Sequence, residues 1–178
     1  RDLALLDAIE AFCREPFAQS VWRVAHEGRD PLQGARSHSR WCNNTFDVLY
    51  TSLERDGALA ESYALLSSQP VFPSKLGSFV HRLSVRATKT LRLADLAILS
   101  NLGVDTSRYR ERIYRRTQEI ADAAHFLGFE GLIAPSARWN GLSLVLFTDR
   151  ISPNDIQLEF NEESPIDWRA WRKNNISR

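Results

Sequence analysis

Short runs of β-branched and aromatic residues alternate along this chain with helix-like patterns, and this alternation limits the folds open to it. The strand-like runs lie at residues 20–25, 47–52, 131–137, 142–147 and 155–160. Because each run is short and ends at turn residues, none of them can bury its apolar side chains alone. The pattern therefore predicts a sheet whose faces are covered by helices from the same chain.

Helical spacing marks the segments between these runs. In residues 3–13 the apolar residues Leu3, Leu6, Ile9 and Phe12 fall on one helical face. We expect further helices over residues 53–67, over 95–103 with a cap at Gly103, and over 166–174. The longest helical pattern covers residues 107–129 and ends at Gly128.

Two features of the predicted strands bear on the architecture. The strand over 20–25 is expected to begin after a break at Pro16, and a long polar loop over 26–40 follows it. Residues 77–94 alternate apolar and polar side chains on both sides of Thr88, which predicts an antiparallel pair of strands. We therefore expect an α+β fold, in which a mixed, largely antiparallel sheet is flanked by helices in a single domain.

Composition narrows the class of protein. The 178 residues are 43% hydrophobic and 25% charged, as in one globular domain with a sizeable core. The formal net charge is +1, which is far from the strongly positive charge that is typical of nucleic-acid-binding proteins. No apolar run approaches the roughly twenty residues of a membrane-spanning helix, and no secretory signal pattern is present, so we expect a cytoplasmic location.

Several catalytic motifs are missing. The sequence has no P-loop, no G-x-G-x-x-G, no H-E-x-x-H and no nucleophile elbow, and its four histidines stand apart from one another. The two cysteines, Cys13 and Cys42, suit neither a disulfide framework nor a structural zinc site. We therefore expect no metal.

Polar side chains stand instead where predicted strands meet loops or helices, which is a common place for a site on a rigid scaffold. These candidate site residues are Arg23, Arg40, Tyr50, Glu61 and Ser136.

The motifs around these residues resemble those of the RES-domain toxins of bacterial Xre-RES toxin–antitoxin pairs. The resemblance rests on "WRVA", on "RW" followed by "VLYTS" and "ALAE", and on "APSA" followed by "LVLF". It runs from about Arg23 to Phe147, within a core of about residues 21–150 in a single domain over 1–178. One departure is that Ser37, His38 and Ser39 stand where family members commonly have glycines.

The resemblance implies a fold like that of the ADP-ribosyltransferases and an enzyme that consumes NAD. The arginine, glutamate and serine for which the family is named would be Arg23, Glu61 and Ser136, with Arg40 and Tyr50 as accompanying residues. It also implies a cognate antitoxin with a helix-turn-helix domain of the Xre type, and an acceptor protein if ADP-ribose is transferred. We expect no direct binding of nucleic acid or membrane.

The residue types suit this chemistry. Cleavage of the bond between nicotinamide and ribose develops positive charge on the ribose ring, which the carboxylate of Glu61 would stabilise. Arg23 and Arg40 could each meet pyrophosphate oxygens with two hydrogen bonds. Tyr50 offers a ring for nicotinamide, and Ser136 a hydroxyl for the amide or a ribose oxygen. These roles make Glu61, Arg23 and Tyr50 the predicted catalytic residues, and Arg23, Arg40, Tyr50 and Ser136 the predicted NAD-binding residues.

Structural roles compete with these assignments. Glu61 could be a solvated residue near a helix start, Tyr50 a core aromatic, and Ser136 a turn or helix cap. The arginines between Arg110 and Arg116 are expected on a solvated face that could bind a partner. An inactive module that only binds its partner remains the alternative function, and hydrolysis, phosphorolysis and ADP-ribosyl transfer remain open as reactions.

Overall fold

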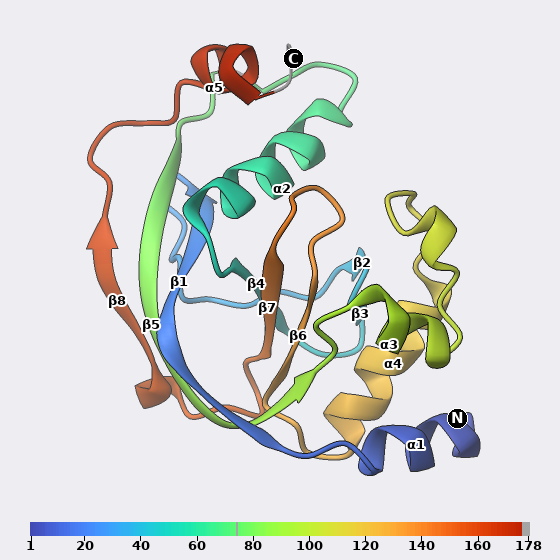
Figure 1. Ribbon diagram of the computed structural model, residues 1–178. Helices are drawn as coiled ribbons and strands as arrows, with labels where there is room; N and C mark the ends of the chain where they lie inside the picture. Colours follow the sequence, from blue (N-terminus) through green and yellow to red (C-terminus); the bar gives the residue numbers. More distant parts are fainter. Residues whose placement is uncertain (74, 176–178) are drawn as a thin grey trace.

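A computed structural model of the protein describes residues 1–73 and 75–175 (Figure 1). The strands are β1 (Glu15–His26), β2 (His38–Ser39), β3 (Cys42–Asn43), β4 (Val48–Ser52), β5 (Ser78–Arg92), β6 (Gly131–Pro135), β7 (Leu142–Phe147) and β8 (Ile156–Asn161). The helices are α1 (Leu3–Glu10), α2 (Arg55–Ser67), α3 (Leu96–Asn101), α4 (Arg115–Phe126) and α5 (Trp168–Asn175), with 3-10 turns η1 (Thr106–Arg108) and η2 (Pro153–Asp155).

Six strands form one sheet in the order β1-β4-β7-β6-β5-β8, and β1 also pairs with β5. Each of these pairings is antiparallel except that of β5 with β6. The predicted α+β fold with a mixed, largely antiparallel sheet is thereby confirmed. Within the described part of the chain, no helix is both long enough and apolar enough to cross a bilayer.

The long strand β5 joins two three-stranded layers (Figure 1). Its first part lies between β1 and β8, and its last three residues pair with β6. Strand β6 pairs in turn with β7, and β7 pairs with β4. At the other side, β1 and β4 pair only through Trp22 and Ser52. The two layers are therefore joined along β5, whereas on the other side β1 and β4 pair at a single register position.

The antiparallel pair predicted across Thr88 is wrong, because β5 runs through this residue without a turn. The Glu130 carboxylate accepts hydrogen bonds from the N–H groups of Thr88 and Lys89, at 3.0 and 2.9 Å, and from the Thr88 hydroxyl at 2.8 Å. These bonds satisfy backbone groups at the point where β5 leaves β1 and approaches β6. A buried carboxylate 42 residues downstream thus binds the backbone at the point where the alternation predicts a turn.

Glu130→Ala is expected to destabilise the fold by about 2–4 kcal/mol, because two N–H donors and a hydroxyl lose their acceptor. Chemical denaturation of the variant and the wild type gives this difference in unfolding free energy. Glu159→Ala is the control, since Glu159 pairs with Arg82 on an exposed surface and should cost about 0–1 kcal/mol. Equal losses in the two variants would contradict the capping role of Glu130.

Two other predicted boundaries are corrected by the structure. Strand β1 begins at Glu15 and passes through Pro16, because an irregularity between Glu15 and Phe17 accommodates the missing N–H donor. The helix predicted over 107–129 is regular only from Arg115 to Phe126, so α2 is longer than α4. The Tyr109 hydroxyl donates to the Pro135 carbonyl at 2.7 Å, and this tertiary contact holds the segment before α4 out of the helix.

The core lies on both faces of the layer formed by β4, β7 and β6. One cluster, with Val21, Leu83 and Leu144, fills the space between the two layers. A second, with Ile9, Leu99 and Ile120, packs α1, α3 and α4 against the other face. The C-terminal helix α5 docks on α2, where the rings of Trp168 and Trp171 lie 6.0 and 5.2 Å from that of Tyr63.

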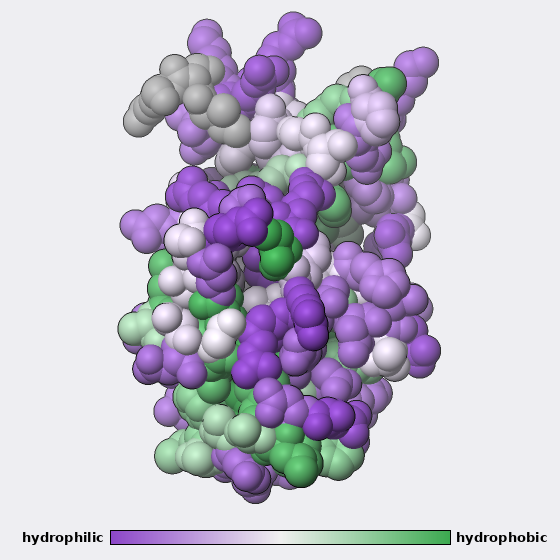
Figure 2. Space-filling model, turned by 90° about the vertical axis from the view of Figure 1, so that its right-hand side faces the viewer, coloured by the Kyte–Doolittle hydropathy of each residue, from purple (hydrophilic) through white to green (hydrophobic). Residues whose placement is uncertain are grey.

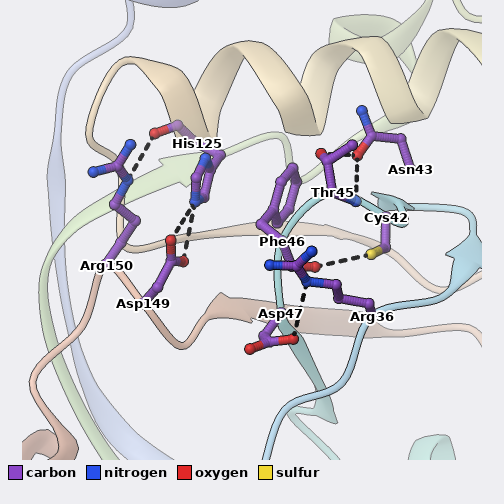
Figure 3. A network of polar contacts seen from close by, with 9 residues as sticks. All are labelled: Arg36, Cys42, Asn43, Thr45, Phe46, Asp47, His125, Asp149 and Arg150. Carbon is purple, nitrogen blue, oxygen red and sulfur yellow. Dashed lines mark hydrogen bonds and ion pairs between the residues drawn. The ribbon is translucent and has the colours of Figure 1, made fainter.

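A polar network fastens the end of α4 to the chain after β7 (Figure 3). His125 donates from Nε2 to the Asp149 carboxylate at 2.8 Å, and its ring stacks on Phe46 with centroids 4.2 Å apart. Arg150 donates to the His125 carbonyl at 3.0 Å. His125 thus serves as a local hydrogen-bonding residue in this network.

Candidate functional site

A cleft of about 370 Å³ opens between α2 and the strands β1 and β4. Its walls include residues 22–26 of β1, residues 50–52 of β4 and the central turns of α2. Further parts come from Ser39 of β2, from Pro135 of β6, and from residues 40, 41, 137 and 138 of the connecting segments. The cleft lies where β1 and β4 share only one register position, so that backbone and side chains from both layers face it.

The cleft contains five arginines and one carboxylate. The carboxylate belongs to Glu61, and the arginines are Arg23, Arg29, Arg40, Arg112 and Arg138. Among the described residues, no carboxylate lies within ion-pairing distance of any of these five guanidinium groups. Arginines elsewhere, such as Arg55 and Arg82, do form ion pairs. The cleft is therefore electropositive and suits an anionic ligand.

The structure brings the candidate residues together. Arg23, Arg40, Tyr50 and Glu61 all line the cleft, although they come from β1, from the loop before β3, from β4 and from α2. Ser136 is not itself a lining residue, but it contacts Glu61. One spatial site thus includes all five candidates.

Glu61 is positioned by Ser136 at the end of β6. The Ser136 hydroxyl donates to Glu61 Oε1 at 2.5 Å and accepts from the N–H groups of Arg138 and Trp139, both at 3.1 Å. Because the hydroxyl proton is directed at the carboxylate, Ser136 orients Glu61 in this structure. The second carboxylate oxygen of Glu61 has no protein donor within the described chain, which leaves it for a ligand.

Arg23 is a largely buried cation. Its Nη1 donates to the carbonyl of Tyr50 at 3.0 Å, while its Nε is buried without a partner among the described residues. Burial, and next the charge of Arg29, lower the pKa of Arg23 to about 10, so the group stays charged at neutral pH. Burying an unpaired charge costs free energy, and a bound anion would offset this cost.

Tyr50 and Arg40 are held by their neighbours. The Tyr50 hydroxyl is hydrogen-bonded to Ser39 Oγ at 2.6 Å and accepts from the N–H of Trp41 at 3.0 Å, and burial raises its pKa to about 12. The Arg40 guanidinium lies against the rings of Tyr109 and Tyr114, at 4.7 and 4.9 Å from their centroids. A neutral phenol and an oriented cation are thus fixed on one wall.

Three arginines of the cleft were not among the candidates. Arg29 follows β1 in the long loop, Arg112 stands in the segment before α4, and Arg138 follows Ser136 by two residues. Because Arg138 lies so close to the candidate Ser136 in the sequence, its position alone suggests that it belongs to the same site. Arg112 is exposed, as the prediction of a solvated face requires, but it lies before the start of α4 rather than on a helix, and its side chain also lines the cleft.

In residues 1–73 and 75–175, no three histidine, cysteine, aspartate or glutamate side chains gather in a way that could hold a metal ion. What the cleft offers is one oriented carboxylate, a half-buried phenol and several unpaired guanidinium groups.

Comparisons with known proteins bear on the fold and the family of this chain. A solved structure with a similar fold is the crystal structure of the M. tuberculosis MbcT–MbcA toxin–antitoxin complex, with a TM-score of 0.84 and 20% identity over 97% of each chain. No curated protein sequence matches the chain. The model of the RES domain family matches residues 20–169, a range that includes every residue lining the cleft. The protein with this oriented glutamate and its surrounding arginines therefore belongs to the RES domain family.

Proposed function

We propose that this protein is the toxin of a toxin–antitoxin pair and that it cleaves NAD at the bond between nicotinamide and ribose. The observation that carries the proposal is the single carboxylate of Glu61, oriented by Ser136, in a cleft that contains five arginines without ion pairs. Membership of the RES domain family and the fold shared with the MbcT–MbcA toxin–antitoxin complex support the biological role.

The substrate's charges match those of the cleft. The pyrophosphate of NAD has two negative charges, and a guanidinium group can bind phosphate oxygens through two parallel hydrogen bonds. Arg23, with its unpartnered Nε, and Arg40, held between two rings, are the proposed phosphate ligands. Tyr50 lines the same cleft and would present its ring to the nicotinamide end.

The reaction needs a group that stabilises positive charge. When the bond between ribose C1 and the nicotinamide nitrogen breaks, the electron pair leaves with nicotinamide and the ribose becomes oxocarbenium-like. The free oxygen of Glu61 would stabilise this charge, while the Ser136 hydroxyl keeps the carboxylate in place. A nucleophile then bonds to C1 and loses its proton. Water, phosphate or an acceptor side chain would give hydrolysis, phosphorolysis or ADP-ribosyl transfer.

Incubation of the purified protein with NAD tests the proposal. We expect release of free nicotinamide, detected by chromatography, and mass spectrometry of the adenosine-containing product identifies the nucleophile. ADP-ribose indicates water, ADP-ribose 1-phosphate indicates phosphate, and adducts on cell proteins indicate transfer. A protein that binds its partner but releases no nicotinamide would instead support the inactive interaction module.

A partner protein completes the proposed function. Expression of the chain is expected to arrest bacterial growth, and co-expression of a helix-turn-helix antitoxin encoded beside it should restore growth. The unpaired arginines around the cleft suit an acidic segment on that partner. Growth arrest that the neighbouring gene does not relieve would count against this partner.

A further inference from the structure

Arg112 occupies an unusual place at the mouth of the cleft. It stands in the irregular segment between η1 and α4, and its Nη2 reaches across to the carbonyl of Ala64 on α2, at 3.4 Å. Ala64 lies about one helical turn after Glu61, and both residues line the cleft. The Arg112 side chain thus connects the two rims of the cleft close to the predicted catalytic carboxylate.

The backbone on both sides of Arg112 is anchored to the rest of the protein. The Tyr109 hydroxyl donates to the Pro135 carbonyl at 2.7 Å, and the Glu111 carbonyl accepts from Arg40 Nη2 at 3.4 Å. After Arg112, the Tyr114 ring lies against the Arg40 guanidinium. Figure 2 shows the side of the molecule on which α3 and α4 lie, and its upper and middle parts are mainly hydrophilic. Arg112 itself is exposed and also lines the cleft, so the segment presents it from a fixed base toward solvent and the cleft.

The Arg112 side chain itself is held weakly. Its neighbours Arg108, Arg115 and Arg116 each pair with a carboxylate, whereas no carboxylate in the described chain pairs with Arg112. A contact of 3.4 Å to a neutral carbonyl is at the long limit for a hydrogen bond. A phosphate oxygen is a stronger acceptor, because charge-assisted hydrogen bonds are roughly twice as strong as neutral ones.

We propose that Arg112 is a substrate-binding arm that exchanges the Ala64 carbonyl for a phosphate oxygen of the bound dinucleotide. The exchange moves only a side chain, because the flanking backbone is anchored. It places the guanidinium over the mouth of the cleft and adds a third cation to the proposed phosphate ligands Arg23 and Arg40. The identity of the ligand rests on the proposed function.

Arg112→Gln tests this role in steady-state kinetics with NAD. We expect the KM for NAD to rise about tenfold to a hundredfold, with kcat changed by less than about threefold, because a charge-assisted bond to the substrate is lost and the reacting atoms are untouched. Arg110→Gln is the matched control, since Arg110 is an exposed residue of the same segment and does not line the cleft. It makes the same change in net charge and should leave KM unchanged.

Binding of ADP-ribose gives a readout that does not depend on turnover. This compound keeps the pyrophosphate and lacks the scissile bond, so it should raise the melting temperature of the wild type and of Arg110→Gln but protect Arg112→Gln much less. Unchanged KM and unchanged protection in Arg112→Gln would overturn the inference, as would equal losses in both variants or a fall in kcat alone. If ADP-ribose protects the wild type but not Arg112→Gln and the wild type does not cleave NAD, the proposed reaction is contradicted and the binding arm is still supported.

Discussion

Glu61→Gln is expected to reduce nicotinamide release from NAD by at least about a hundredfold, the scale typical of losing one charge-stabilising group in an enzyme site. The substitution keeps the shape of the side chain and an oxygen that can accept from the Ser136 hydroxyl, but it removes the negative charge. The oxocarbenium-like ribose then has no counter-charge, because Glu61 is the one carboxylate that lines the cleft in the described structure.

The matched control is Glu54→Gln. Glu54 precedes the same helix, lies at the protein surface and accepts from Trp139 Nε1 at 3.2 Å outside the cleft lining. It should keep wild-type activity within about threefold, as expected of an exposed residue away from the reacting atoms. Circular dichroism should show both variants folded. Equal rates of nicotinamide release in Glu61→Gln and the wild type would end the catalytic assignment of this residue.

Arg23→Met is expected to have two opposite effects. The value of kcat/KM should fall by at least about a hundredfold, because a buried phosphate ligand is lost. The unfolding free energy should rise by about 1–2 kcal/mol, because methionine fills similar space without a desolvated charge. The lost hydrogen bond to the Tyr50 carbonyl offsets part of this gain, by about 1 kcal/mol.

The direction of the stability change follows from the pKa of Arg23. Burial lowers it to about 10, below its ordinary value of 12.5, so the folded protein holds this proton less tightly than the unfolded chain does. The cost of folding with a charged Arg23 is therefore fully present at neutral pH and decreases as the pH rises through about 10. The wild type should gain stability relative to Arg23→Met over that range.

Chemical denaturation and NAD kinetics on the same samples measure both effects of this substitution. Arg82→Met is the control, because Arg82 lies on the same layer but pairs with Glu159 at an exposed position. It should lose about 0–1 kcal/mol and retain activity. A less stable Arg23→Met protein would show that the guanidinium supports the fold, and would contradict the view that its burial serves ligand binding.

Much of the site could be predicted because its residues stand at recognisable places in local patterns. Arg23 and Tyr50 lie in strand-like runs, Glu61 lies on the helix that follows directly, and Ser136 ends another run after Pro135. The resemblance to a known family then assigned roles to these positions. The partners of each group could not be predicted, because Ser136 and Glu61 are 75 residues apart in the chain.

Local periodicity is a property of neighbouring residues. The amino-acid pattern alone therefore predicts the strands β4, β6 and β7, the helices α2 and α3, and the fold class. The course of β5 through Thr88, the irregular segment before α4 and the entry of Arg112 into the cleft were decided only in three dimensions. Each depends on a hydrogen bond to a residue far away in the chain, namely Glu130, Pro135 or Ala64. Such bonds form only after the layers have packed, and they then outweigh the weak local preferences of the segments that they join.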